Sequence, residues 1–334
     1  MYIEFILIFI LSLLLVNVIK RYGEKMGFID IPNDRSVHVD HTPRAAGIGF
    51  FLAVAIILPL FHLDYMLDHF WIFFAIFLVF IIGVLDDHHD ASPNTKFIVL
   101  TLSTIMLFFD HTAFNDLGVF FGWHITLGWF ALFFNIFAIV GFTNALNLID
   151  GLDGLAAIIS LVILGTYFTV GYTNDDFFMM WLSMAFISTL LAFLIFNWNP
   201  ASIFMGDSGS LTLGFVIAIL SVKSLEYLPT VSILFITAIP LYDTLIVMIR
   251  RKYNGRSAFL ADRCHMHHIL RHFFAEDTKK TVLFLGILQA NFAITGLQLN
   301  KNIDGGYMLI LFVLNVLTLY IILAAMIKRQ KRDC

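Results

Sequence analysis

Long apolar runs constrain this chain more than any other feature of its sequence. A helix that crosses a bilayer needs roughly 20 predominantly apolar residues, and eleven runs of about this kind are present. Only 13% of the 334 residues are charged, against about 25% in an ordinary soluble domain, so a water-soluble globule is excluded. We therefore predict an all-α polytopic membrane protein with about eleven transmembrane helices. The runs are 2–19, 46–62, 69–85, 97–109, 128–146, 155–172, 177–196, 209–222, 229–249, 281–299 and 306–327.

We interpret the chain as a single integral-membrane domain, residues 1–334. The first run has Glu4 but no basic residue ahead of its apolar core and no small-residue cleavage site after it, so we expect a retained span and not a signal peptide. The net charge of −4 and the lack of a basic domain argue against a nucleic-acid partner. Cys264 and Cys334 imply no disulfide framework.

The distribution of basic residues predicts the orientation in the membrane. Cytoplasmic loops retain Lys and Arg, and 18 of the 20 Lys and Arg residues follow odd-numbered runs or lie at the C-terminus. We therefore expect a periplasmic N-terminus and a cytoplasmic C-terminus. The polar clusters that could carry chemistry lie on the same loops, which predicts an active site at the cytoplasmic face. These loops are 20–45, 86–96, 144–154, 197–208 and 250–280.

Three aspartates crowd the end of the third run, in the sequence DDHHD. If the helix continues, Asp86 and Asp90 are i,i+4 neighbours and Asp87 and Asp90 are i,i+3 neighbours, so the carboxylates share one side. Such like charges are tolerated beside a divalent cation or a bound cationic group, or in water. We favour a metal-binding or general-base role for Asp86 and Asp87 over a solvated helix end. Lys96, about two turns further on, would balance the acids or bind a phosphate.

Amide and carboxylate side chains recur every third residue in the next cluster, at Asn144, Asn147, Asp150 and Asp153. This spacing keeps them on one slowly rotating helical face at the membrane boundary, and their oxygens are ligands that Mg²⁺ accepts. A polar loop with a capping aspartate is the simpler alternative. Polar groups beside apolar spans are costly and functional by default, so we expect a functional cluster.

The sequence FMGDSGS begins at Phe204 and precedes the eighth run. Asp207 or Ser208 would serve as a helix N-cap, and a helix N-terminus with small residues is also an anion or phosphate cradle. Phe204 would stack on a nucleobase, although an ordinary interfacial aromatic is the more common outcome for one of 37 Phe residues. The segment is therefore a candidate part of a phosphate or nucleotide site.

Histidines cluster in the loop after the ninth run, in the sequence RCHMHH. The spacing of His265, His267 and His268 suggests zinc, but no closed tetrahedral ligand set completes it. Arginine pairs bidentately with phosphates and histidine donates to them, so Arg263 and the histidines suit a diphosphate better. A solvated basic loop would explain the arginine but not three histidines. Asp243, inside the preceding run, is expected to support neighbouring groups of the site.

In this order, the motifs DDxxD, NxxNxxDGxDGL, FMGDxGS and HxHH resemble those of the polyprenyl-phosphate N-acetylhexosamine-1-phosphate transferases. The resemblance covers almost the whole chain. DRCHMHH and PNDRSVH are more similar to the bacterial undecaprenyl-phosphate N-acetylglucosaminyl-1-phosphate transferase branch than to the phospho-MurNAc-pentapeptide translocases. The chain departs from the family pattern in PRAAGIG, where Ala46 replaces one of two glycines.

The resemblance implies a multi-pass enzyme of the bacterial inner (cytoplasmic) membrane. It would transfer N-acetylglucosamine 1-phosphate from UDP-GlcNAc to undecaprenyl phosphate, giving undecaprenyl-diphospho-GlcNAc and UMP, in the first membrane step of a lipid-linked cell-surface polysaccharide. It implies Mg²⁺ as the cofactor, with Mn²⁺ as an alternative, and contact with the lipid bilayer; a homodimer stays open. We favour direct attack by the acceptor phosphate over a covalent enzyme intermediate.

By motif position, Asp207 and Asn147 are the expected Mg²⁺ ligands. Asp86 or Asp87 would orient or deprotonate the acceptor phosphate, although such a phosphate is largely dianionic at neutral pH because its second pKa is about 6. The other predicted residues bind substrate or shape its pocket. Lys96, Arg263, His265, His267 and His268 would hold diphosphate or sugar, Asn144 would contact substrate, Phe204 would stack on uracil, and Asp150 and Asp153 would act as catalytic residues at the nucleotide pocket.

Other functions fit less well. The same chemistry with another UDP-N-acetylhexosamine is the nearest alternative, because one acetyl or methyl difference is recognised by local shape. An aspartate-rich membrane prenyltransferase also uses DDxxD with Mg²⁺, but a second similar motif is missing. A transporter would place its ionisable groups near the midplane of the bilayer, whereas they cluster at one face here. A structural scaffold would have no reason to hold one-sided Asp, Asn and His clusters.

Overall fold

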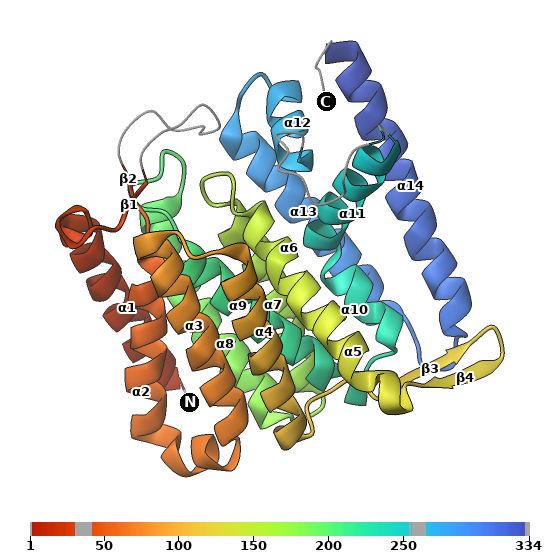
Figure 1. Ribbon diagram of the computed structural model, residues 1–334, viewed down its shortest axis with the longest axis horizontal. Helices are drawn as coiled ribbons and strands as arrows, with labels where there is room; N and C mark the ends of the chain where they lie inside the picture. The colour runs from red at the N-terminus through yellow and green to blue at the C-terminus, as the bar shows by residue number, and fades with distance from the viewer. Residues whose placement is uncertain (1, 31–41, 254, 256–264, 331–334) are drawn as a thin grey trace.

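The computed structural model describes residues 2–30, 42–253, 255 and 265–330, so Arg263 lies outside the described residues. The described chain is almost entirely helical, as predicted (Figure 1), and all eleven apolar runs form helix. The α-helices are α1 (Tyr2–Tyr22), α2 (Ala46–Asp68), α3 (Phe70–His89), α4 (Pro93–Leu107), α5 (Ala131–Asn135), α6 (Gly141–Ile149), α7 (Leu155–Thr173), α8 (Phe177–Asn197), α9 (Asp207–Lys223), α10 (Thr230–Ile236), α11 (Ala238–Tyr253), α12 (Met266–Phe273), α13 (Thr278–Gln298) and α14 (Gly305–Gln330).

Nine helical segments of the described chain are long and apolar enough to cross a membrane. The α10–α11 pair would make a tenth span, which is bent by 85° at Thr237. α4 has only 15 residues, or about 22 Å of helix, and is therefore shorter than the hydrocarbon core of a bilayer, which is about 30 Å thick. The predicted multi-pass architecture is present, whereas the predicted count of about eleven spans depends on α4.

Among the described residues, two short antiparallel sheets of two strands each, the second of them a β-hairpin, are exceptions to the all-α prediction. The hairpin occupies the Trp- and Gly-rich stretch near residues 117–128 and exposes Trp123 and Phe121. Asp304, just before α14, accepts hydrogen bonds from the backbone N–H groups of Phe121 and Gly122 at the tip of that hairpin, at 2.7 and 2.8 Å. The strands are β1 (Ile29–Asp30), β2 (Thr42–Pro43), β3 (Asp116–Phe120) and β4 (Trp123–Thr126).

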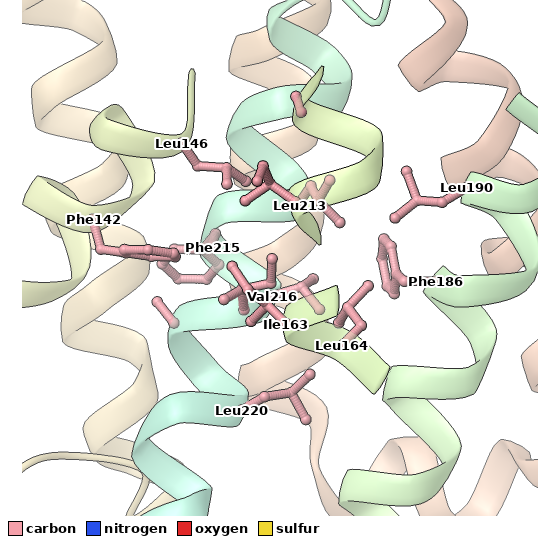
Figure 2. Close-up of a cluster of buried hydrophobic side chains, with 14 of the residues drawn as sticks. Phe142, Leu146, Ile163, Leu164, Phe186, Leu190, Leu213, Phe215, Val216 and Leu220 are labelled. Carbon is pink, nitrogen blue, oxygen red and sulfur yellow. The ribbon is translucent and has the colours of Figure 1, made fainter. Parts of the chain in front are cut away.

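α9 is the central helix of the bundle. It contacts α2, α3, α6 and α7, and every residue from Ser208 to Val222 is buried. Figure 2 shows apolar side chains of α6, α7, α8 and α9 meeting in this core. The residues labelled there are Phe142, Leu146, Ile163, Leu164, Phe186, Leu190, Leu213, Phe215, Val216 and Leu220.

Two glycines let α2 and α3 approach the start of α9. A Cβ at Gly47 would lie 2.1 Å from the backbone nitrogen of Gly209, and a Cβ at Gly83 would lie 2.5 Å from the Cα of Ser208. No side chain fits at such distances, so both contacts require glycine. They bring the aspartates at the end of α3 to the first turn of α9.

The predicted polar clusters share one face of the molecule. The ends of α1, α3, α6, α8 and α11 lie at the upper end of the bundle in Figure 1, where α14 also ends, and α1 begins near the opposite end. The one-sided arrangement expected from the sequence is therefore seen in the fold. The orientation of this face toward the cytoplasm stays a prediction.

Candidate active site

A cleft of about 330 Å³ lies at this end of the bundle, where segments far apart in the sequence meet. Its walls come from the first loop, the end of α3, the segment after α6, the segment before α9, and the α12–α13 region. The predicted site residues on its wall are Asp87, Asn147, Asp150, Asp153, Phe204, Asp207 and His268.

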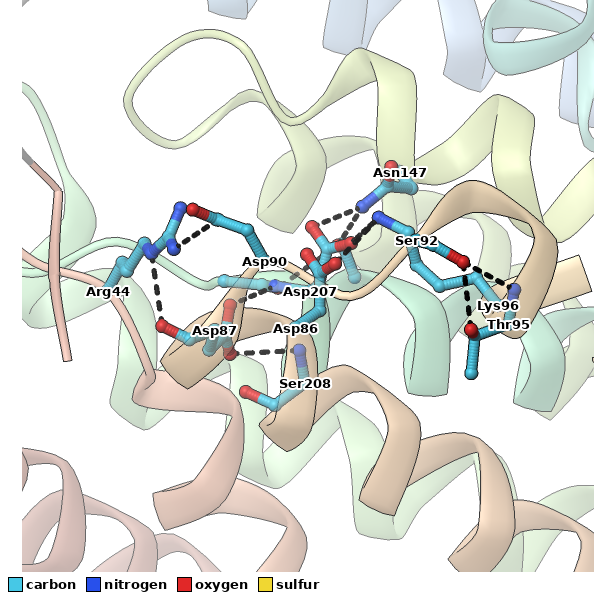
Figure 3. Close-up of polar contacts among 12 residues, drawn as sticks. Arg44, Asp86, Asp87, Asp90, Ser92, Thr95, Lys96, Asn147, Asp207 and Ser208 are labelled. Atoms are coloured by element: carbon cyan, nitrogen blue, oxygen red, sulfur yellow. Dashed lines mark hydrogen bonds and ion pairs between the residues drawn. The ribbon is translucent and has the colours of Figure 1, made fainter. Parts of the chain in front are cut away.

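Asp87 is a buried carboxylate that holds the N-terminus of α9. Its two oxygens accept hydrogen bonds from the backbone N–H groups of Asp207 and Ser208 at 2.7 and 3.0 Å (Figure 3). A negative charge there is favoured by the free N–H groups and the dipole of α9. Gly206 has φ +75°, and a Cβ on it would lie 2.5 Å from an Asp87 oxygen, so glycine is required at this turn. The N-cap position is Gly206, and the expectation that Asp207 or Ser208 would cap α9 is wrong.

A charge cluster joins α3, α4, α6 and α9. The Lys96 ammonium lies 3.0 Å from a carboxylate oxygen of Asp86 and 3.0 Å from one of Asp207. The Asn147 amide donates to the other Asp207 oxygen at 2.9 Å, as Figure 3 shows. Lys96 therefore lies between two carboxylates and balances the acids, which is one of the two roles expected for it.

Asp90 does not share a side with the other two aspartates, and that expectation is wrong. α3 ends at His89, and Asp90 has a left-handed conformation with φ 49°. Its side chain is 85% exposed and pairs with the Arg44 guanidinium at 2.8 Å. The end of the helix therefore separates Asp90 from Asp86 and Asp87.

The predicted helical face from residue 144 to residue 153 ends early. α6 stops at Ile149, and a turn follows it. Asn147 faces the charge cluster, whereas Asn144 is exposed, donates to the Val140 carbonyl at 2.9 Å and is absent from the cleft wall. The structure thus separates two amides that the three-residue spacing placed together.

Asp150 lies in this turn on the wall of the cleft. Burial, reinforced by the charges of Asp207, Asp87 and Asp153, raises the pKa of Asp150 to about 7. Its protonation state therefore changes near neutral pH. A cation bound beside it would favour the charged form.

Asp153 organises the cleft wall through hydrogen bonds to the segment before α9. Its Oδ2 accepts from the Asn199 amide at 2.8 Å and from the Ala201 backbone N–H at 3.0 Å. Asn197 makes the reciprocal connection, since its side-chain oxygen accepts from the Gly154 N–H at 2.8 Å. These bonds fix the turn after α6 against the segment that leads to Asp207.

The first loop is joined by backbone hydrogen bonds to the segment that contains Phe204. The Phe204 N–H donates to the Pro43 carbonyl at 2.8 Å, and the Ala46 N–H donates to the Phe204 carbonyl at 3.1 Å. Phe204 is half-buried on the cleft wall. Ala46, which stands where the family pattern has a glycine, does not prevent the close contact between α2 and α9, because Gly47 makes that contact.

The three histidines have different surroundings. The Nδ1 of His265 lies 2.6 Å from the buried Asp243 carboxylate, which also accepts from the Met266 N–H at the start of α12. Asp243 thus supports the histidine segment, as predicted. His268, one turn further on, lies on the cleft wall.

His267 is buried behind the turn after α6. Burial lowers its pKa to about 3, so the ring is neutral. Its Nε2 would lie 2.7 Å from a Cβ placed on Gly151. Within the part of the chain that the structure describes, its Nδ1 has no hydrogen-bond partner. Of the three histidines, only His268 lines the cleft.

The oxygen donors around Asp207 fit a magnesium ion whose remaining ligands would come from a substrate and water. The described residues hold no ready-made group of three His, Cys, Asp or Glu side chains for a metal. Mg²⁺ is usually held by one or two carboxylates, substrate phosphates and water instead of a protein cage. Asp207 and Asn147 supply a carboxylate and an amide on the cleft wall, which is a donor set of that kind.

Sequence reasoning did not identify every residue on the cleft wall. Arg44 is the clearest omission, since its guanidinium bonds Asp90 and the Asp87 carbonyl and lines the cleft. In the sequence, Arg44 was counted only as a basic residue that sets the orientation in the membrane. Its position just before the second apolar run was the one feature that could have indicated a place in the site. Asp30, Asn197 and Thr278 also lie on the wall, and isolated polar residues in loops give no comparable signal.

Comparisons with known proteins agree with these motifs. Residues 69–225, from α3 to α9, match the family described as glycosyl transferase family 4. A probable undecaprenyl-phosphate N-acetylglucosaminyl 1-phosphate transferase of Bacillus subtilis (strain 168) is 33% identical over 323 residues, covering 93% of this chain and 89% of the relative. Undecaprenyl-phosphate alpha-N-acetylglucosaminyl 1-phosphate transferases of Yersinia pestis and Escherichia coli (strain K12) are 31% and 29% identical, each over 80% of this chain and over 76% and 75% of the relatives.

Proposed function

This chain belongs to the polyprenyl-phosphate N-acetylhexosamine-1-phosphate transferase family, and from that membership we propose that it transfers N-acetylglucosamine 1-phosphate from UDP-GlcNAc to undecaprenyl phosphate. The products are undecaprenyl-diphospho-GlcNAc and UMP. The enzyme is a multi-pass membrane protein, and we place it in the bacterial inner membrane with the cleft toward the cytoplasm, where UDP-sugars are made.

The reaction exchanges one phosphoanhydride bond for another. An oxygen of the acceptor phosphate attacks the β-phosphorus of the UDP-sugar and forms a new P–O–P linkage. The bond from the β-phosphorus to the bridging oxygen breaks, and that oxygen leaves with UMP. A dianionic acceptor releases no proton in this step, so positioning and charge neutralisation matter more than a general base.

One observation carries the proposal: Asp207 and Asn147 lie on the wall of a cleft at the edge of the membrane-spanning bundle, and Lys96 contacts Asp207 at the N-terminus of the buried helix α9. Phosphoryl transfer needs fixed positive charge and fixed donors near the diphosphate. A lipid acceptor can keep its chain among the apolar helices while its phosphate reaches this cleft.

The proposal assigns a role to several residues of the site. Asp87 positions α9 through two backbone N–H groups, so we assign it a positioning role and not that of a base. Arg44 and His268 face the cleft and would bind phosphate oxygens, and Phe204 would stack on uracil. Mg²⁺, held by Asp207 and Asn147, would neutralise charge on the diphosphate when bound.

The test is UMP release by the purified protein with undecaprenyl phosphate, Mg²⁺ and a panel of UDP-sugars. We expect release with UDP-GlcNAc that requires undecaprenyl phosphate and stops when the divalent cation is chelated. Release of UMP only with another UDP-N-acetylhexosamine would change the assigned donor but leave the type of reaction as proposed. Turnover of a prenyl diphosphate, without any use of prenyl phosphate, would contradict the reaction and support a prenyltransferase.

A further inference from the structure

A second pocket lies between α11 and α14, at the end of the bundle that holds the candidate active site (Figure 1). It has a volume of about 220 Å³. Among the described residues, it shares no lining side chain with the active-site cleft. Nothing in the proposed reaction uses it.

The pocket combines positive charge with an apolar floor. Arg250, in the last turn of α11, and Lys328, in the last turn of α14, provide the charge. Ile246 and Leu323 lie about one turn deeper on the same two helices, and with Ile327, which directly precedes Lys328, they form the floor. A ligand that fits these walls is anionic at one end and apolar at the other.

The pocket lies where both helices change from apolar to basic sequence. α14 is the least buried of the candidate spans, so most of its length is exposed on the outside of the bundle. Tyr320 lines the pocket, and tyrosine is enriched at the membrane–water interface. Basic pockets between membrane helices at this level suit phospholipid head groups. The depth of the pocket therefore matches that of a lipid phosphate.

Orientation of the chain in the membrane does not by itself explain these residues. A basic residue that only sets orientation has to reach water, as the exposed Lys252 and Arg329 do. Arg250 is instead only 7% exposed and forms part of a cavity wall.

We propose that this pocket binds the head group of an anionic phospholipid from the leaflet on the active-site side. The phosphate lies between Arg250 and Lys328, and the first acyl carbons lie on Leu323 and Ile327. Bound there, the lipid bridges α11 to α14. α11 follows the 85° bend and carries Asp243, so the lipid braces the helix that supports the histidine segment.

The test measures phospholipid binding to the purified full-length protein by native mass spectrometry, with phosphatidylglycerol as the anionic probe. Lys328→Gln removes one exposed cation of the pocket, and Ala324→Trp fills the pocket without a change of charge. Arg329→Gln is the matched control, because it removes an exposed cation from the same turn of α14 but outside the pocket. Monodisperse elution of each variant in size-exclusion chromatography checks that the protein is folded.

We expect Lys328→Gln to weaken phosphatidylglycerol binding about fivefold, since a basic residue near an anionic lipid contributes about that much. Ala324→Trp should abolish the specific binding, and Arg329→Gln should leave it unchanged. Equal retention of phosphatidylcholine, equal binding of free glycerol phosphate, or loss in all three variants alike would overturn the proposal. Retention of undecaprenyl phosphate in place of phosphatidylglycerol would overturn it too, by making the pocket a second site for the acceptor.

Discussion

Asp207 is the residue on which the contacts of the active site converge, because it begins α9 and its carboxylate meets both Lys96 and Asn147. We expect Asp207→Asn to reduce Mg²⁺-dependent UMP release by at least about 10²-fold, the usual loss when one fixed electrostatic group is removed from such a site. The measurement is kcat for UMP release in purified, monodisperse protein.

Asp64→Asn is the control for that substitution, because Asp64 is an exposed carboxylate near the other end of the bundle. It should retain full turnover. Near-normal turnover of a well-folded Asp207→Asn protein would contradict the assigned metal role.

The raised pKa of Asp150 predicts a pH dependence. The group is protonated below about pH 7 and charged above it, so protons compete with a cation on the acidic side. The apparent affinity for Mg²⁺ should therefore rise about tenfold between roughly pH 6 and pH 8, as the fraction ionised rises from about a tenth to nine-tenths. Titration of UMP release with Mg²⁺ at both pH values measures this.

Asp150→Asn keeps the shape of the side chain but cannot ionise. This variant should show the same apparent Mg²⁺ affinity at both pH values. A rise with pH that persists in Asp150→Asn would assign the titration to another group.

At the scale of helices, the start of α9 depends on close contacts that leave no room for a side chain. Gly47→Ala would place a Cβ 2.1 Å from the Gly209 nitrogen, so α2 and α9 must separate. Overpacking of this kind costs about 1–3 kcal/mol. We expect a lower Tm together with lower activity, because the same shift moves Asp207.

Gly165→Ala provides the comparison, since a Cβ at this position in α7 meets nothing within 4 Å. Its Tm should stay the same or rise slightly, because alanine favours a helix over glycine. A Gly47→Ala protein as stable as Gly165→Ala would show that the α2–α9 contact is looser than described.

We expect Asp243 of α11 and the residues that it contacts at the start of α12 to act together. Asp243 bonds both His265 and the Met266 N–H, and α12 carries His268 to the cleft. Loss of one such hydrogen bond costs about 1 kcal/mol, so Asp243→Asn should raise KM for UDP-GlcNAc about fivefold, with a smaller change in kcat. His265→Ala should act in the same direction.

A double variant tests whether Asp243 and His265 act through one shared contact or independently of each other. Residues that act through one contact are not additive, so Asp243→Asn with His265→Ala should be no worse than His265→Ala alone. Asp304→Asn, at the opposite end of the bundle, should leave KM unchanged. Additive losses in the double variant would show that the two residues contribute separately.

The helices themselves could be predicted because their apolar runs report burial or lipid contact directly. Two local features could not. The end of α6 at Ile149 interrupts a regular spacing of polar residues, since distant Asn197 accepts a hydrogen bond from the turn after it and Asn199 donates one to it. The bend between α10 and α11 lies inside one apolar run, where Gln289 of α13 bonds the Ile236 carbonyl and the Ile239 N–H.

The grouping of Asp207, Asn147 and Lys96 could be predicted, because polar side chains beside apolar spans are costly and tend to gather. The site was not predictable where three-dimensional contacts decide the role. Asp87 looked equivalent to Asp86 in the sequence, yet its oxygens meet two N–H groups of a helix 120 residues away. His267 looked like a ligand-binding histidine, and it is buried behind Gly151.

For the whole molecule, the one-sided site only works if that side faces the compartment that holds UDP-sugars. The basic residues predict a cytoplasmic location, and the path of the chain requires the other ends of the helices to face outward. α4 is the critical element, because its 15 residues must still carry the chain from one side to the other. If α4 did not cross, the parity of every later helix would change.

Cysteine accessibility tests this path. In a chain with Cys264 and Cys334 replaced by serine, Ser92→Cys lies just before α4, and Thr126→Cys lies in the hairpin that follows it. A membrane-impermeant maleimide added to spheroplasts should label Thr126→Cys at once and Ser92→Cys only after permeabilisation. Full UMP release shows that each variant is folded. Labelling of both positions from the same side would mean that α4 returns without crossing, and the cleft would then have to be reassigned relative to the membrane.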